Sequence, residues 1–125
     1  MKVLVILEHA KGKIVGQTKE AITAAKDIGD ITLEGVVLGH NITAIAEEAI
    51  KYGISKVYKV DDPSLTGVNL LFHLRTLQEL INSTSPEVIL AAATLYGQEM
   101  MPRLAARFGQ ALLPGVKSIE VDDDE

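Results

Sequence analysis

Apolar residues gather in short blocks along the chain, separated by segments in which apolar and polar positions recur at helical spacing. Unbroken apolar blocks cover residues 3–7 and 88–93, and a third apolar stretch covers 31–38. Runs of this kind are typical of parallel strands that are covered on both faces. Two shorter segments, 57–60 and 116–121, predict two further strands, the last one at an edge of the sheet.

The segments between these blocks predict helices. Thr18 is the expected N-cap of a first helix, and Asn41 is the expected N-cap of a second. The second helix has apolar residues at i, i+3, i+4 and i+7, which are Ile42, Ile45, Ala46 and Ala49. A third helix is expected over 68–82, where Leu70, Leu74, Leu77 and Ile81 share one face.

Pro102 sets the expected start of the last helix. Proline is accepted in the first turn of a helix, where its missing N–H would have had no partner. The helix is therefore expected to begin near residues 100–102, which leaves 94–99 as a loop. Strands and helices alternate throughout, so right-handed crossovers predict an α/β fold. We expect a doubly wound, mainly parallel five-stranded, Rossmann-like sheet with helices on both faces.

Composition narrows the class of protein. With 125 residues, 47% of them hydrophobic, the chain has enough apolar material for one domain over 1–125. A net charge of −5, two Phe and no Trp argue against nucleic acid as a partner. The absence of Cys is compatible with a reducing cytoplasm. The apolar run before Glu8 is too short for a signal peptide or a membrane span, so we expect a cytoplasmic protein.

The common catalytic signatures of this fold class are missing. No GxGxxG follows a strand, and neither GxxxxGK[ST] nor GxSxG occurs. The three histidines share no HxxH or HExxH spacing, so no metal site is predicted. His73 is expected to be a surface or boundary residue of the third helix. We therefore expect no catalytic residues and a protein that is not itself an enzyme.

Polar residues follow three of the predicted strands, where an open α/β sheet holds its ligands. They are the candidates for a nucleotide site: Glu8, His9, Gly39, His40, Thr94, Gly97 and Gln98. The alternative interpretation is that Asn41 is simply a helix cap and His9 an ordinary loop residue.

Charged residues of the last helix also permit two interpretations. Arg103 and Arg107 are four residues apart and could hold an anion or a partner's carboxylate. Glu99 lies four residues before Arg103, so the three could instead pair among themselves. A carboxylate at the start of this helix would also occupy the positive end that attracts phosphate.

Four segments carry a family pattern in order and spacing: VLVILEHAKGKI, EAITAAKDIG, AEEAIKYGISKVYKVDDP and AATLYGQEMMPRLAARFG. Through them nearly the whole chain resembles the N-terminal domain of the alpha subunit of electron-transfer flavoproteins. The resemblance implies an adenine nucleotide alpha hydrolase-like fold. It also implies a structural and docking role in a heterodimer that passes electrons from dehydrogenases through FAD.

In that family a C-terminal domain of the alpha subunit chiefly holds the FAD. Residues 1–125 are expected to lack that domain and to bind no FAD alone. The beta subunit packs against the alpha domain and in many members holds AMP. The implied partners are thus the beta subunit and the C-terminal FAD domain, and an isolated chain could cover an apolar beta-facing surface as a homodimer. The alternative is a stand-alone adenine-nucleotide-binding or sensor domain of similar fold.

Overall fold

A sheet of six strands forms the centre of the molecule in the computed structural model, which describes residues 1–27, 29–66, 70–92, 94–108, 112–113 and 117–120. Four strands run parallel: β1 (Lys2–Ile6), β4 (Thr32–Gly39), β5 (Lys56–Asp61) and β6 (Val88–Ala91). Two more, β8 (Lys117–Glu120) and β7 (Leu112–Leu113), continue antiparallel beyond β6, giving the order β5-β4-β1-β6-β8-β7.

The doubly wound α/β prediction is confirmed, but the strand count of five was wrong. The additional strand, β7, has only two residues, too few to leave a periodic pattern in the sequence. It pairs outside β8, so β8 is not at the edge of the sheet as predicted.

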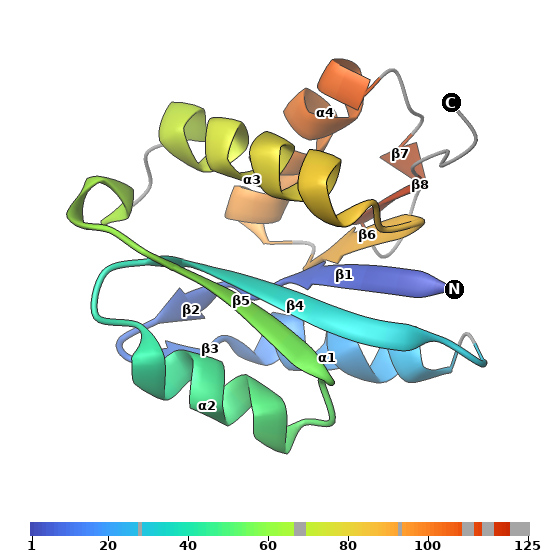
Figure 1. The fold of residues 1–125 in the computed structure, drawn as a ribbon, viewed down its shortest axis with the longest axis horizontal. Coiled ribbons are helices and arrows are strands. Elements are labelled where there is room, and N and C mark those ends of the chain that lie inside the picture. The colour runs from blue at the N-terminus through green and yellow to red at the C-terminus, as the bar shows by residue number, and fades with distance from the viewer. Residues whose placement is uncertain (28, 67–69, 93, 109–111, 114–116, 121–125) are drawn as a thin grey trace.

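Helices cover both faces of the sheet. Figure 1 shows α1 (Gly16–Lys26) and α2 (Thr43–Lys51) below it, with α3 (Leu70–Thr84) and α4 (Leu95–Phe108) above. A 3₁₀ turn, η1 (Pro63–Leu65), leads from β5 towards α3, and a small hairpin of β2 (His9–Ala10) and β3 (Lys13–Ile14) follows β1. None of the helices in the described segments is long and apolar enough to span a membrane.

The core consists of two apolar layers, one on each face of the sheet. Leu4 and Ile6 of β1 belong to the layer beneath α3 and α4, whereas Val3 and Val5 belong to the layer against α1 and α2. These four side chains are at most 3% exposed. Burial on both faces explains why β1 is an unbroken apolar run rather than an alternating one. Gly35 of β4 is a close-approach point, because a Cβ there would lie 2.7 Å from Cδ1 of Leu7.

Helix starts were predicted less well. Helix α1 begins at Gly16 with Val15 as its N-cap, so Thr18 lies inside the first turn and does not cap it. The Thr18 side chain is fully buried, and its hydroxyl has no hydrogen-bond partner among the described residues. Helix α2 begins at Thr43 after the N-cap Ile42, and Asn41 is not its cap.

Helix α4 begins at Leu95, five or more residues before the predicted start, and Pro102 lies in its interior. Thr94 caps the helix, because its hydroxyl accepts a hydrogen bond from the N–H of Gly97 at 3.1 Å. An interior proline costs a helix about 3 kcal/mol. Burial of the flanking side chains offsets that cost; those of Met100, Met101 and Leu104 are completely buried.

Thr18→Val is expected to stabilise the fold by about 1 kcal/mol, because it replaces an unpaired buried hydroxyl with a methyl group of similar volume. Urea denaturation measures the change. Thr23→Val is the matched control, since Thr23 lies exposed on the same helix and donates to the carbonyl of Lys19. A Thr18→Val protein no more stable than the original would contradict the burial of an unpaired hydroxyl.

Candidate functional site

The sheet reverses its strand order at β1, with β4 on one side and β6 on the other. The segments that leave β1 and β6 at their carboxyl ends therefore separate, and this is where open α/β sheets bind ligands. Glu8 follows β1 and Thr94 follows β6. The Thr94 hydroxyl donates a short hydrogen bond to Oε1 of Glu8, which joins the two segments across this point.

Glu8 takes the position that the sequence assigned to Glu99. Because α4 begins at Leu95, Glu99 lies beyond the first turn and is exposed to solvent. The Glu8 carboxylate instead approaches the positive end of α4 through the capping hydroxyl of Thr94. A carboxylate was expected at this helix end, and one is found there. It belongs to Glu8, however, and not to Glu99.

A cavity of about 310 Å³ opens at the carboxyl ends of β1 and β4. Four of the seven predicted nucleotide-site residues line it, and Thr94, Gly97 and Gln98 are not among its described lining residues. The described lining residues are Ile6, Leu7, Glu8, His9, Ala10, Lys11, Leu38, Gly39, His40, Leu65, Thr66, His73 and Tyr96. Much of the wall is thus apolar, with polar groups supplied by four different segments.

His73 was expected at the surface or at its boundary, yet it is only 6% exposed and lines this cavity. Its Nε2 lies 3.1 Å from the carbonyl oxygen of Leu65, and its Nδ1 lies 2.8 Å from the Tyr96 hydroxyl. A carbonyl only accepts, so Nε2 carries the proton and Nδ1 accepts from the phenol. His73 stands three residues after Leu70 and four before Leu77, so the helical spacing itself could have placed it on the buried face.

Both polar side chains of this contact stay uncharged at neutral pH. Burial lowers the pKa of His73 below its usual value, which favours the neutral imidazole. Burial, and to a smaller extent the nearby Glu8 charge, raises the pKa of the Tyr96 hydroxyl. The contact therefore links α3, α4 and η1 without introducing a charge into the cavity wall.

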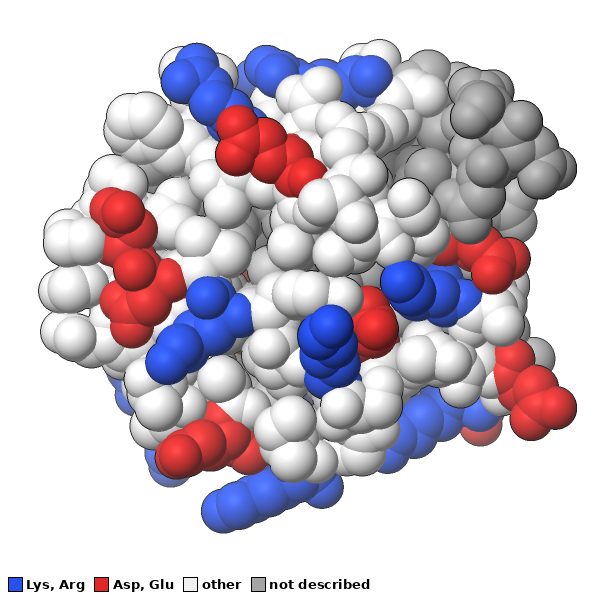
Figure 2. Space-filling view, viewed as in Figure 1, with Lys and Arg blue, Asp and Glu red and all other residues white. Residues whose placement is uncertain are grey.

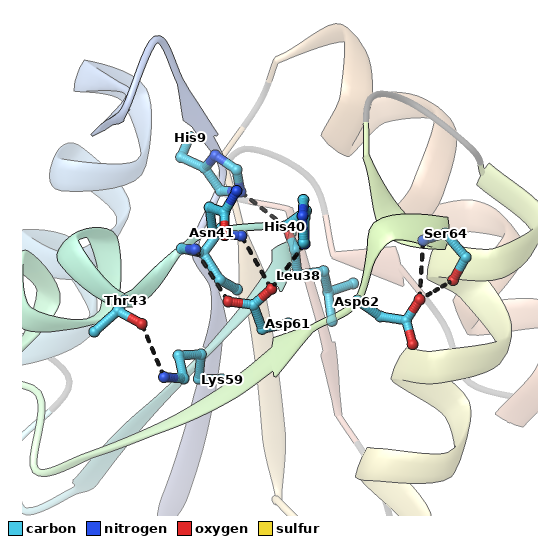
Figure 3. A network of polar contacts seen from close by, with 10 residues as sticks. His9, Leu38, His40, Asn41, Thr43, Lys59, Asp61, Asp62 and Ser64 are labelled. Carbon is cyan, nitrogen blue, oxygen red and sulfur yellow. Dashed lines mark hydrogen bonds and ion pairs between the residues drawn. The ribbon is translucent and has the colours of Figure 1, made fainter.

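Asp61, at the end of β5, holds the loop that carries His40 (Figure 3). Its Oδ1 accepts from the Asn41 N–H at 3.0 Å and the His40 ring at 3.2 Å, and its Oδ2 accepts from the Ile42 N–H at 3.3 Å. The hydrogen bond from the Asn41 N–H is the main cause that lowers the pKa of this carboxyl. Asp61 thus holds the turn that leads into α2 from another strand, which local sequence could not reveal.

His9 and Gly39 meet behind this loop. Nε2 of His9 donates to the carbonyl of Leu38 at 2.8 Å, and a Cβ on Gly39 would lie 3.1 Å from that nitrogen and 2.9 Å from Ile42. His9 is thus the first residue of β2 and not a loop residue. It fastens the β2–β3 hairpin to β4 and lines the cavity.

The remaining predicted residues belong to packing or to the surface. Gly97 is buried in the first turn of α4, where a Cβ would lie 2.0 Å from the carbonyl oxygen of Ala92.

Arg103 and Arg107 are exposed, and Arg107 donates to the Gln78 side chain of α3 at 2.8 Å. Among the described residues the ion pairs are Lys19–Glu48 and His40–Asp61, so the predicted Glu99–Arg103–Arg107 pairing is not formed. Those residues contain no cluster of three or more potential metal ligands.

Comparisons with known proteins agree over nearly the whole chain. A family model described as "Electron transfer flavoprotein domain" matches residues 3–125. The chain is 32% identical over 121 residues to "Electron transfer flavoprotein subunit alpha" of Bacillus subtilis (strain 168), a match that covers 96% of this chain and 37% of that protein. It is 28% identical over 123 residues to the protein of the same description from Thermoanaerobacterium thermosaccharolyticum, with the same coverage.

A third relative carries a different description. The chain is 30% identical over 125 residues to "Lactate dehydrogenase (NAD(+),ferredoxin) subunit LctC" of Acetobacterium woodii, with 98% of this chain and 30% of that protein covered. The chain spans about a third of the length of the curated relatives it matches.

Asp61→Asn is expected to lower stability at pH 7, because an amide offers one neutral oxygen where the carboxylate binds three donors. The folded pKa of Asp61 is below its unfolded value of about 3.9, so this stabilisation is complete above that pH and is lost as the pH falls further. Urea midpoints of the original and the variant should converge below about pH 4. The exposed Asp27→Asn serves as control, and a gap that persists at low pH would contradict the role of the charge.

Gly97→Ala is expected to cost about 2–3 kcal/mol of stability, because the added methyl group collides with a main-chain carbonyl that cannot yield easily. Gly16→Ala is the matched control, since nothing lies within 4 Å of a Cβ there and alanine favours a helix. Thermal or urea unfolding of both variants tests the difference. Equal stabilities would contradict the close packing of α4 on β6.

Proposed function

Because the chain belongs to the electron transfer flavoprotein domain family, we propose that it is the N-terminal structural and docking domain of an alpha subunit. The whole protein would be an electron carrier in which this domain, residues 1–125, has no catalytic residue of its own. FAD would be held by a C-terminal domain of the alpha subunit, and AMP by a beta partner. We propose a cytoplasmic location, and a homodimer when the domain is isolated. The observation that carries this proposal is the match over residues 3–125, supported by relatives described as alpha subunits.

The outer side of α4 supports a docking role. Leu95, Glu99, Arg103 and Arg107 follow one another at intervals of four, so they form one stripe along the helix. Leu95 is 74% exposed, and Leu71 and Phe72 at the start of α3 are also exposed apolar residues.

On the face drawn in Figure 2, basic and acidic side chains are interspersed without a large patch of one sign. Such a mixed surface suits a protein partner better than a polyanion.

A second function, adenine-nucleotide binding by the domain itself, is favoured by the cavity. Glu8, His9, Gly39 and His40 line a space at the edge of the sheet where ligands bind. Thr94 contributes indirectly through its hydrogen bond to Glu8. The proposed positions of Gly97 and Gln98 lie outside the described cavity wall, so they are not part of this proposal.

Arg103→Glu is expected to weaken association with the beta subunit encoded in the same genome by at least tenfold, because it reverses an exposed charge on the α4 stripe. Co-purification and size-exclusion chromatography of the native gene product with that subunit measure the complex. Lys51→Glu is the control, since it reverses one exposed charge on α2, on the other face of the sheet. Equal binding by both variants would exclude α4 from the interface.

Flavin absorbance tests the cofactor part of the proposal. The complex of the native proteins should carry FAD, whereas a purified chain of residues 1–125 should be colourless. Stoichiometric flavin on residues 1–125 alone would contradict the assignment of FAD to another domain.

A further inference from the structure

We propose that Glu8 makes the cavity selective for an uncharged nucleoside over the corresponding nucleotide. This inference rests on the cavity of the second function above as a ligand site, and it replaces the nucleotide by the nucleoside as the preferred ligand. Glu8 lines the cavity at the point where β1 and β6 separate, and only its Oε1 has a hydrogen-bond partner among the described residues. The second carboxylate oxygen is thus available to accept hydrogen bonds from ligand hydroxyls, as acidic residues do with ribose in related sheets.

The size and walls of the cavity suit such a ligand. Its volume of about 310 Å³ lies at the small end of the range of roughly 300–1,000 Å³ for ligand pockets. Ile6, Leu38 and Leu65 provide apolar wall, and Tyr96 adds an aromatic ring. A nucleoside combines a flat ring with a hydroxyl-bearing sugar, so it can place the first against this wall and the second at Glu8.

Phosphate would find the start of α4 partly occupied. A helix start attracts phosphate through its free N–H groups and its positive end. At α4, the N–H of Gly97 donates to the Thr94 hydroxyl and the N–H of Gln98 donates to the Thr94 carbonyl at 2.8 Å. The carboxylate of Glu8 stands on the other side of Thr94, so a phosphate there would also meet a like charge.

The basic side chains of the cavity wall offer little attraction to offset the repulsion between a phosphate and Glu8. His9 directs Nε2 to the carbonyl of Leu38, and His40 faces Asp61. His73 is buried and neutral between Leu65 and Tyr96. Lys11 is the lysine among the described lining residues, and it is exposed at the turn of the β2–β3 hairpin, where water screens its charge. The repulsion of a phosphate group by Glu8 would therefore exceed its attraction to Lys11.

Isothermal titration calorimetry with adenosine and AMP tests the proposal. The original protein should bind adenosine at least tenfold more tightly than AMP, and Glu8→Gln should reduce this ratio to less than threefold. Glu99→Gln is the control, because it removes an exposed carboxylate of α4 that does not line the cavity. AMP binding as tight as adenosine, or an unchanged ratio in Glu8→Gln, would overturn the inference.

A measurement on the unaltered protein keeps the test independent of the variant's folding. The 2′,3′-dideoxy form of adenosine lacks two hydroxyls and should bind at least tenfold more weakly than adenosine. Equal binding of the two would overturn the role of Glu8 as hydroxyl acceptor. Binding of neither adenosine nor AMP at millimolar concentration would refute both this inference and the second function. The docking function would be unaffected, because it depends on the outer face of α4.

Discussion

The burial of β1 on both faces is the constraint on which the rest of the structure depends. A parallel strand in the middle of a sheet needs a helical layer on each side, and the two apolar layers of the core meet at alternate residues of β1. The placement of α1 and α2 opposite α3 and α4 follows from this requirement. So does the divergence of the chain at the carboxyl ends of β1 and β6, where the cavity and Glu8 lie.

Carboxylates organise this edge of the sheet by binding main-chain or hydroxyl donors from other segments. Asp61 holds the turn before α2 from the neighbouring strand, and Glu8 supports the cap of α4 through Thr94. Both therefore occupy positions near helix starts that free anions would otherwise favour. The edge retains the shape of a ligand site while its charge disfavours phosphate. That combination is consistent with the proposed docking role, in which another domain would hold the flavin.

Strand positions were predictable because burial on both faces leaves an unbroken apolar run, as in β1 and β6. Four cavity residues were also predictable, since a polar residue directly after such a run lies at the carboxyl edge of the sheet. Helix starts were not. Thr18 and Asn41 have the right chemistry for caps, but α1 begins before Thr18, and the N–H of Asn41 itself is bound by Asp61, which is distant in sequence. The interior position of Pro102 depends on side chains packed beneath α4, which outweigh the local penalty.

The sequence by itself thus determined the fold class, the family resemblance and the edge of the sheet that carries the candidate site. These depend on local periodicity and on residue order, which a single chain displays directly. Only the tertiary structure decided that Glu8 rather than Glu99 stands at α4, that His73 is buried, and that Gly97 packs against Ala92. Each of these contacts joins segments from different elements. Their geometry depends on how the layers pack, and no local pattern records it.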